Sequence, residues 1–184
     1  GYRASGIIQT QEEADEYNSK YNLSYLSGTA WTPGDVKYID LNNDGKIDRG
    51  DNNLNNMGDM TIIGNTTPRY QYTINGSISW KDLSLSVMFQ GVGKRDWDPG
   101  TAPYFWGSGA YAQVTVFNEH MDYWREDNKD AYYPKPYIHS AGGVGPFRNK
   151  IMQTSDRYLQ SGAYCRLKNI TLSYNLPSAW VKKA

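Results

Sequence analysis

The feature that most constrains the fold is an alternation of apolar and polar residues between residues 70 and 93, to which Met88 and Val92 are exceptions. Tyr, Ile, Gly and Trp occupy the even positions of 70–80, whereas Gln, Thr, Asn and Ser occupy the odd positions. After Lys81 and Asp82 the pattern resumes, with apolar residues or glycine at the odd positions of 83–93. Successive side chains of a strand point to opposite faces, so the pattern predicts two antiparallel strands joined by a two-residue turn.

Two properties of this hairpin favour strands that cross a membrane. Each strand has the roughly 9–11 residues that a tilted strand needs to span a bilayer. The apolar face of the first strand begins with Tyr70 and ends with Trp80. Aromatic residues at both ends of an apolar face are typical of strands that meet two membrane interfaces. We therefore expect the apolar face to point outward, although a strand of a soluble β-sandwich shows a similar alternation.

The connections between the predicted strands are very unequal. A third alternating segment covers 164–176, and the residues at 94–163 separate it from the hairpin, which only two residues close. Outer-membrane barrels combine short periplasmic turns with long extracellular loops. Arg166 and Lys168 have the parity of the apolar face of this third strand, which predicts that the strand leaves the membrane before Lys168.

The sequence therefore predicts an all-β fold, namely a segment of a large antiparallel transmembrane β-barrel with long extracellular loops that carry short helices. The expected domains are an extracellular loop region at 1–69, a transmembrane hairpin at 70–93, a long extracellular loop at 94–163, a transmembrane strand at 164–176 and a truncated periplasmic turn at 177–184. Thr10 and Glu13 form a capping-box pattern, which predicts a surface helix over 11–21. Because unpaired strand edges cannot face hydrocarbon, we expect the chain to be part of a larger protein.

Composition narrows the choice of partners. The chain has 16 Tyr and 6 Trp but only 4 Phe, and amphipathic aromatics suit membrane interfaces and sugar-binding loops. Lys and Arg number 19, as do Asp and Glu, so no basic field favours nucleic acid. The single cysteine, Cys165, excludes an internal disulfide framework.

Residues 40–51, DLNNDGKIDRGD, match the spacing of an EF-hand-type calcium loop. Oxygen ligands fall at positions 1, 3, 5, 7, 9 and 12, and a glycine at position 6 permits the sharp turn. The predicted metal ligands are Asp40, Asn42, Asp44, the carbonyl of Lys46, Asp48 and Asp51. Because the preceding DVKYI is typical of a strand and position 12 is Asp instead of Glu, we expect a structural Ca²⁺ and not a calcium sensor. A metal-free Asn/Asp/Gly turn is the alternative.

The chain contains no recognisable catalytic constellation, and we expect no enzymatic activity. His120 and His139, the only two histidines, have neither zinc-ligand spacing nor a nucleophile motif nearby, and His120 is expected on a helix surface. Aromatic residues between positions 97 and 137 are candidates for stacking on sugar rings or for packing the loop: Trp97, Tyr104, Phe105, Trp106, Tyr111, Tyr123, Trp124, Tyr132, Tyr133 and Tyr137.

Four segments together resemble the C-terminal third of SusC/RagA-family TonB-dependent transporters. They are PGDVKYIDLNNDGKID at 33–48, GDMTIIGNTTPRYQYTING at 58–76, FQGVGKRD at 89–96 and RLKNITLSYNLP at 166–177. The resemblance implies an outer-membrane barrel of about 22 strands with an internal plug. It also implies import of oligosaccharides or peptides with a SusD-like surface lipoprotein as partner, driven by the TonB complex through parts absent from this chain.

Two other classes of protein remain as alternatives. A secreted calcium-stabilised carbohydrate-binding β-domain would account for the 40–51 loop and the aromatic residues, but not for the unequal connections. A surface hydrolase would need an acid/base pair or a nucleophile, and no two carboxylates stand out as such a pair.

Overall fold

The computed structural model describes residues 1–99, 118–137, 150 and 153–177. Some positions named in the sequence predictions lie outside these residues. They are His139, Tyr104, Phe105, Trp106, Tyr111 and most of the predicted 177–184 turn. The described part contains seven strands, one α-helix and one 3₁₀ helix, so it is mainly β-structure, as expected. The chain divides into two compact units: Gly1–Gly64 with Asp98–Leu159, and Asn65–Trp97 with Gln160–Ala184.

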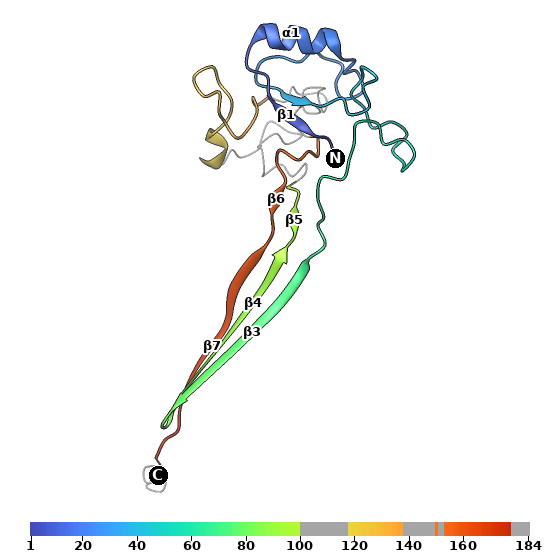
Figure 1. The fold of residues 1–184 in the computed structure, drawn as a ribbon. Coiled ribbons are helices and arrows are strands. Elements are labelled where there is room, and N and C mark those ends of the chain that lie inside the picture. Colours follow the sequence, from blue (N-terminus) through green and yellow to red (C-terminus); the bar gives the residue numbers. More distant parts are fainter. Residues whose placement is uncertain (100–117, 138–149, 151–152, 178–184) are drawn as a thin grey trace, which may run out of the picture. The chain divides into compact units, whose positions relative to one another are not determined.

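In the first unit, helix α1 (Gln11–Lys20) lies in the chain between β1 (Ala4–Ile7) and β2 (Val36–Tyr38), which pair as a small antiparallel sheet (Figure 1). The helix begins where the sequence predicts, because Thr10 Oγ1 accepts the N–H of Glu13 at 3.2 Å. The Glu13 carboxylate in turn accepts the N–H of Gln9 at 2.6 Å. This cap differs from a standard capping box, in which Glu13 would bind the N–H of Thr10 itself.

The core of the first unit is built around Trp31. Its side chain is completely buried, and its Nε1–H donates to the carbonyl of Val36 at 2.9 Å, so its one polar group is satisfied. The other buried members of the main cluster are Tyr2, Ile8, Ala14, Tyr17, Leu23, Leu26, Val36, Tyr38, Ile47 and Tyr158. A second cluster joins Ile7, Trp124 and Ala131, so that residues 118–137, including the 3₁₀ helix η1 (Asn118–Met121), belong to a packed unit.

A buried ion pair lies beside this core. Lys150 Nζ is 3.2 Å from Asp35 Oδ2, and the two side chains are 1% and 0% exposed. The hydroxyl of Tyr137 donates to the other oxygen of Asp35, and the N–H of Thr32 donates to Oδ2 at 2.8 Å. Burial lowers the pKa of Lys150 below its ordinary value, and the neighbouring Asp35 opposes that shift. Both charges are thus compensated, as buried charges must be.

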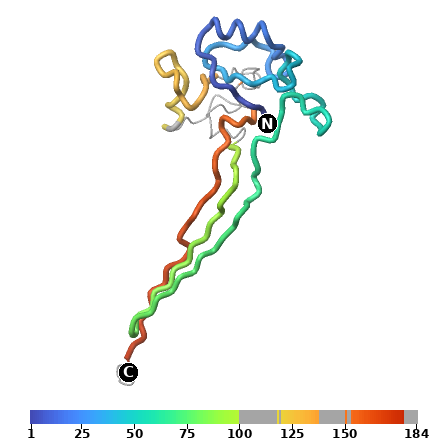
Figure 2. Tube along the Cα trace, viewed as in Figure 1, coloured from blue at the N-terminus to red at the C-terminus, as the bar shows by residue number. Residues whose placement is uncertain are grey.

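The second unit is an antiparallel sheet of three long strands in the order β3 (Arg69–Trp80), β4 (Leu83–Lys94) and β7 (Tyr164–Tyr174) (Figures 1 and 2). A two-stranded sheet of β5 (Asp96–Trp97) and β6 (Gln160–Ser161) accompanies it. Trp80 pairs with Leu83, so the turn contains only Lys81 and Asp82, as the alternation predicts. Lys81 has a left-handed backbone conformation, with φ of 53°.

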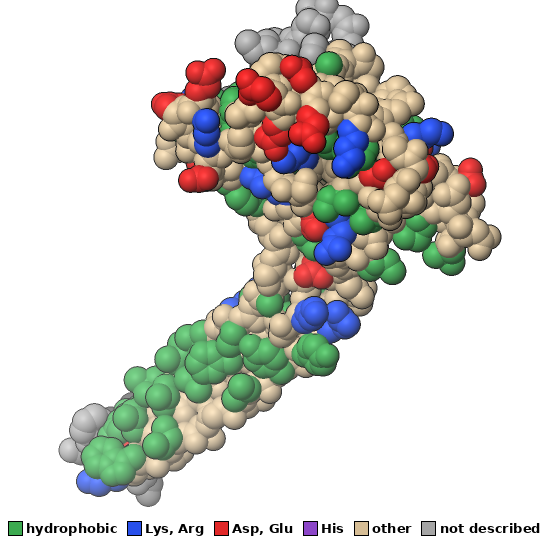
Figure 3. Space-filling view, turned by 45° about the horizontal axis from the view of Figure 1, so that its top comes forward, with side chains coloured by type: hydrophobic (Ala, Val, Ile, Leu, Met, Phe, Trp, Pro, Cys, Tyr) green, Lys and Arg blue, Asp and Glu red, His purple; other side chains and the backbone are tan. Residues whose placement is uncertain are grey.

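The register places apolar residues of all three strands on one face of this sheet. Directly opposed residues share a face, and five rows of them run across the strands. These rows are Trp80–Leu83–Tyr174, Ile78–Leu85–Leu172, Gly76–Val87–Ile170, Ile74–Phe89–Leu167 and Tyr72–Gly91–Cys165. The opposite face carries mainly Ser, Thr, Asn and Gln. Figure 3 shows the apolar side chains gathered along one face of the sheet.

A β-bulge in β7 corrects the predicted placement of Arg166. Met88 pairs with Asn169, but the next residue, Phe89, pairs with Leu167, so Lys168 is an extra residue without an opposite partner. The extra residue reverses the phase of the strand. Arg166 therefore lies opposite Gln90 on the polar face, and not on the apolar face as simple alternation predicts.

Candidate functional site

The predicted calcium loop follows β2 and is wrapped by hydrogen bonds from its own backbone. Asp40 Oδ1 accepts the N–H of Asn43 at 2.7 Å, and Oδ2 accepts the N–H of Gly45 at 2.9 Å. Gly45 has φ of 77°, a conformation that glycine adopts without strain. Asp44 repeats the pattern by accepting the N–H of Lys46 at 2.8 Å. The side chains at positions 1 and 5 thus hold the backbone in a tight turn.

The loop is also anchored to the core of the first unit. Ile47 is completely buried within the main cluster, and its N–H donates to the carbonyl of Asn22 at 3.1 Å. The N–H of Asn22 donates to the carbonyl of Gly45 at 2.8 Å. These contacts fix the middle of the loop against the segment that follows α1.

The six predicted ligands are only partly brought together. Asn42 Nδ2 lies 3.2 Å from Asp44 Oδ2, so the first half of the loop forms a local cluster with Asp40. Asp48 accepts the N–H of Gly50, whereas Asp51 accepts a hydrogen bond from Asn56 at 3.0 Å. Within the described residues, no three His, Cys, Asp or Glu side chains form a ready metal cluster. The donors are carboxylate, amide and carbonyl oxygens, which is the chemistry that Ca²⁺ prefers.

Asp59 is a residue of this loop region that the spacing rule does not include. It is 1% exposed, and its Oδ1 accepts the N–H of Leu41 at 2.7 Å and that of Asn42 at 3.5 Å. Its Oδ2 accepts the N–H of Asp48 at 2.9 Å. Burial raises the pKa of Asp59 above its ordinary value, these backbone donors oppose that shift, and the nearby Asp40 adds to it.

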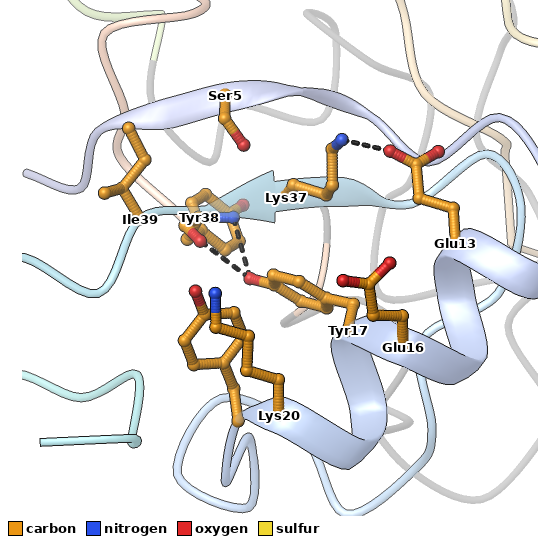
Figure 4. Close-up of a pocket in the computed structure, with 9 residues that line it drawn as sticks. Ser5, Glu13, Glu16, Tyr17, Lys20, Lys37, Tyr38 and Ile39 are labelled. Atoms are coloured by element: carbon orange, nitrogen blue, oxygen red, sulfur yellow. Dashed lines mark hydrogen bonds and ion pairs between the residues drawn. The ribbon is translucent and has the colours of Figure 1, made fainter. Parts of the chain in front are cut away.

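A pocket of about 330 Å³ lies between α1 and β2 (Figure 4). Most of its polar groups serve to join these two elements. The hydroxyl of Tyr17 accepts the N–H of Tyr38 at 2.9 Å and donates to the Tyr38 carbonyl at 2.8 Å. Glu13 forms an ion pair with Lys37. The pocket therefore contributes to the docking of α1 and contains no arrangement of a nucleophile with a base.

Several of the candidate aromatic residues have structural roles. Trp124 and Tyr133 are buried, and Trp124 Nε1 donates to Gln9 Oε1 at 2.9 Å. The Tyr137 hydroxyl contacts Asp35, as described above. His120 is 4% exposed, and its ring meets that of Tyr133 edge-on at 5.4 Å. The expectation of a surface histidine was therefore wrong, because the η1 segment packs this ring inward.

None of the helices among the described residues is both long and apolar enough to span a membrane. No protein-family model matches the chain. Two curated proteins of Formosa agariphila are similar to it over almost its whole length. TonB-dependent receptor P26 is 27% identical over 96% of the chain, and TonB-dependent receptor P3 is 28% identical over all of it. The chain spans about 15% of the length of each relative.

These similarities relate the chain to the class of TonB-dependent receptors. They do not distinguish the SusC/RagA type within that class.

Proposed function

We propose that this chain forms part of the barrel wall and extracellular rim of a SusC/RagA-type TonB-dependent transporter in the outer membrane. The observation that carries this proposal is the apolar face of the three-stranded sheet. Ile74, Ile78 and Leu172 are 59%, 68% and 68% exposed, although the register lines them up with apolar neighbours on adjacent strands. A continuous apolar face of this kind requires an apolar environment, and lipid supplies it.

The distribution of aromatic residues on this face agrees with a membrane-facing surface. Trp80 and Tyr174 share the row next to the hairpin turn, and Tyr72 lies in the row at the other end. Aromatic rings at both ends of an apolar band suit the two interfaces of a bilayer. The polar face would then line the lumen of the barrel, where Arg166 is hydrated.

The substrate and partners follow from the same proposal. The transporter would import oligosaccharides or peptides, with a SusD-like lipoprotein over its extracellular mouth and energy from the TonB complex. The support for these partners is the resemblance of four sequence segments to the SusC/RagA family. The first unit, with its long segments and aromatic residues, would then lie on the extracellular side, where loops of outer-membrane barrels carry binding functions.

We also propose that the 40–51 loop binds one structural Ca²⁺. The support is the spacing of oxygen ligands, the hydrogen bonds that wrap the loop around Asp40 and the anchoring of Ile47 in the core. Extracellular calcium modules of this kind typically bind with Kd of about 10⁻⁴–10⁻³ M. Asp40, Asn42, Asp44, Lys46, Asp48 and Asp51 are the positions that the spacing assigns as ligands.

A pair of lysine substitutions on neighbouring residues tests the membrane face. Ile78→Lys would place a charge in lipid, between the middle of the apolar band and its aromatic end, and should destabilise the full-length protein in vesicles by about 1–3 kcal/mol. Ser77→Lys would place the same charge on the polar face and should have little effect. The measurement is urea unfolding of each variant in lipid vesicles. Equal effects at the two positions, or a full-length protein that stays soluble without detergent, would contradict a lipid-facing sheet.

The partner is tested separately by purifying the full-length transporter from its native membrane. A SusD-like surface lipoprotein should co-purify with it in mild detergent. A transporter that is recovered alone, yet imports an oligosaccharide or peptide normally, would contradict the SusD-like partner while leaving the membrane proposal intact.

A further inference from the structure

We infer that Asp59, and not Asp51, supplies the closing carboxylate of the calcium loop, and that residues 51–58 are an insertion looped out of it. This inference rests on the proposed calcium site and changes its ligand set. It follows from the backbone path between positions 48 and 59.

The insertion leaves the loop and returns at one narrow neck formed by Gly50 and Gly58. Both glycines have φ of 54°. A Cβ added to Gly50 would lie 2.7 Å from the backbone nitrogen of Gly58. A Cβ added to Gly58 would lie 2.4 Å from the nitrogen of Gly50 and 2.7 Å from the carbonyl oxygen of Asp48. The two backbones are therefore in direct contact, and only glycine fits at either position.

Between these glycines the chain forms a closed side loop. The backbones of Asn53 and Asn56 exchange hydrogen bonds of 3.2 and 3.3 Å, and Asn56 Nδ2 binds Asp51 Oδ2 at 3.0 Å. Asp51 is exposed, and its carboxylate is thus occupied within the side loop. The residue that the sequence spacing places at position 12 belongs to the insertion.

If residues 51–58 are left out of the count, the calcium loop has the twelve residues of an EF-hand-type loop. Positions 1 to 11 of the loop run from Asp40 to Gly50, and the first residue after the neck is Asp59. Position 12 of an EF-hand-type loop is the carboxylate that closes the loop over the cation. Asp59 also lies beside the loop in three dimensions. Its N–H donates to the carbonyl of Asp48, at position 9, at 2.9 Å.

The Asp59 side chain connects the beginning of the loop with its ninth position. Its oxygens accept the N–H groups of Leu41, Asn42 and Asp48, as described above. A carboxylate has about four lone-pair sites, so these three donors leave room for a cation. Asp59 is almost completely buried and forms no salt bridge with a described residue. A buried carboxylate without a cationic side chain is a suitable partner for a metal ion.

Calcium titration calorimetry of the full-length transporter in detergent tests this inference with three variants. Asp59→Asn should weaken calcium binding by about 10- to 100-fold. Asp51→Asn should leave the Kd within about twofold of the wild type, since the Asp51 carboxylate is held by Asn56 within the side loop. Deletion of residues 51–58 joins Gly50 to Asp59 and should retain one calcium ion per chain. Thermal unfolding without calcium shows whether each variant is folded.

The possible outcomes separate this inference from the calcium proposal. If the wild type takes up no calcium, both are overturned. If Asp51→Asn abolishes binding while Asp59→Asn binds normally, the calcium site stands and the assignment of Asp59 is wrong. If Asp59→Asn fails to fold, the deletion variant decides, because loss of calcium binding from a folded deletion variant would place an essential ligand within the insertion.

Discussion

The aromatic ring of Tyr72 lies across Gly91, its partner in the neighbouring strand, and fills the space that a side chain at Gly91 would need. A Cβ at Gly91 would come within 2.3 Å of the Tyr72 ring and within 2.5 Å of the carbonyl oxygen of Tyr164. The strand β4 therefore requires glycine at this position, because it is enclosed by a ring on one side and a backbone on the other.

We expect Gly91→Ala to destabilise the full-length protein by about 1–3 kcal/mol, because the methyl group must displace the ring or the backbone. Gly76→Ala is the matched control, since the nearest atom to its added Cβ would be Val87 Cγ2 at 3.6 Å, an ordinary contact. That control should be neutral or stabilising. Urea unfolding in lipid vesicles measures both, and equal losses of stability would show that the ring does not constrain Gly91.

The buried pair of Lys150 and Asp35 should be far more important for stability than a surface pair. Lys150→Ala leaves a buried carboxylate without its cation and should cost about 3–5 kcal/mol. Arg125→Ala removes an exposed ion pair with Asp127, which is 3.0 Å long, and should cost less than about 1 kcal/mol. Thermal and chemical unfolding of the first unit, followed by tryptophan fluorescence, compares the two. Similar effects would mean that water reaches the Asp35 site.

Alkaline pH should destabilise the first unit through Tyr158. Burial raises the pKa of Tyr158 from 10.0 to about 12, although the adjacent Arg157 opposes the shift. Because the folded state retains a proton that the unfolded chain loses, this stabilisation is complete below pH 10 and is lost as the pH rises towards 12. The shift corresponds to roughly 2–3 kcal/mol.

The Tyr158→Phe variant has no proton to lose at this position, so its stability should fall less steeply between pH 10 and 12 than that of the wild type. Tyr25→Phe, at an exposed position, serves as the control. Unfolding curves recorded across this range measure the slopes. If the stability of Tyr158→Phe falls with pH as steeply as that of the wild type, other groups cause the loss of stability at alkaline pH.

Removal of calcium should loosen the 40–51 loop. With a chelator present, the turn keeps its hydrogen bonds, including those to Asp40 and Asp44, but loses the cation that would join its carboxylates, so proteases should cleave the loop faster. Asp44→Ala should be cleaved quickly whether calcium is present or not. Limited proteolysis followed by mass spectrometry locates the cuts. If the wild type is cleaved at the same rate with and without calcium, the loop is a metal-free turn.

Local patterns in the sequence anticipate much of this structure. The alternation over 70–93 is enough to predict the hairpin and its turn, since period-two hydrophobicity has one structural interpretation at this length. The Thr10 cap identifies the start of α1 for a similar reason. The bulge at Lys168 is not visible in the sequence, because an extra residue looks like an ordinary strand residue until its partners are known.

Local sequence patterns do not predict contacts between residues that are far apart in the chain. Asp35 and Lys150 are 115 positions apart, and neither has a local pattern that marks it as buried. Asp59 escapes the spacing rule because that rule assumes a continuous loop, whereas here the path returns through Gly50 and Gly58. The pair Gly50 and Gly58 is the only sign of the insertion in this stretch of sequence. The sequence alone does not distinguish two glycines that touch from two glycines in ordinary turns.

The bulge in β7 also determines how tolerance to mutation should vary along that strand. From Asn169 to Tyr174 the even-numbered positions face the apolar side, whereas from Tyr164 to Leu167 the odd-numbered positions do. A scan that introduces a charge at each position should thus show an alternating profile whose phase reverses at Lys168. Loss of the extra residue would move residues 164–167 to the opposite faces of the sheet. We therefore expect a deletion at Lys168 to be tolerated only when the residue types on one side of it are exchanged as well.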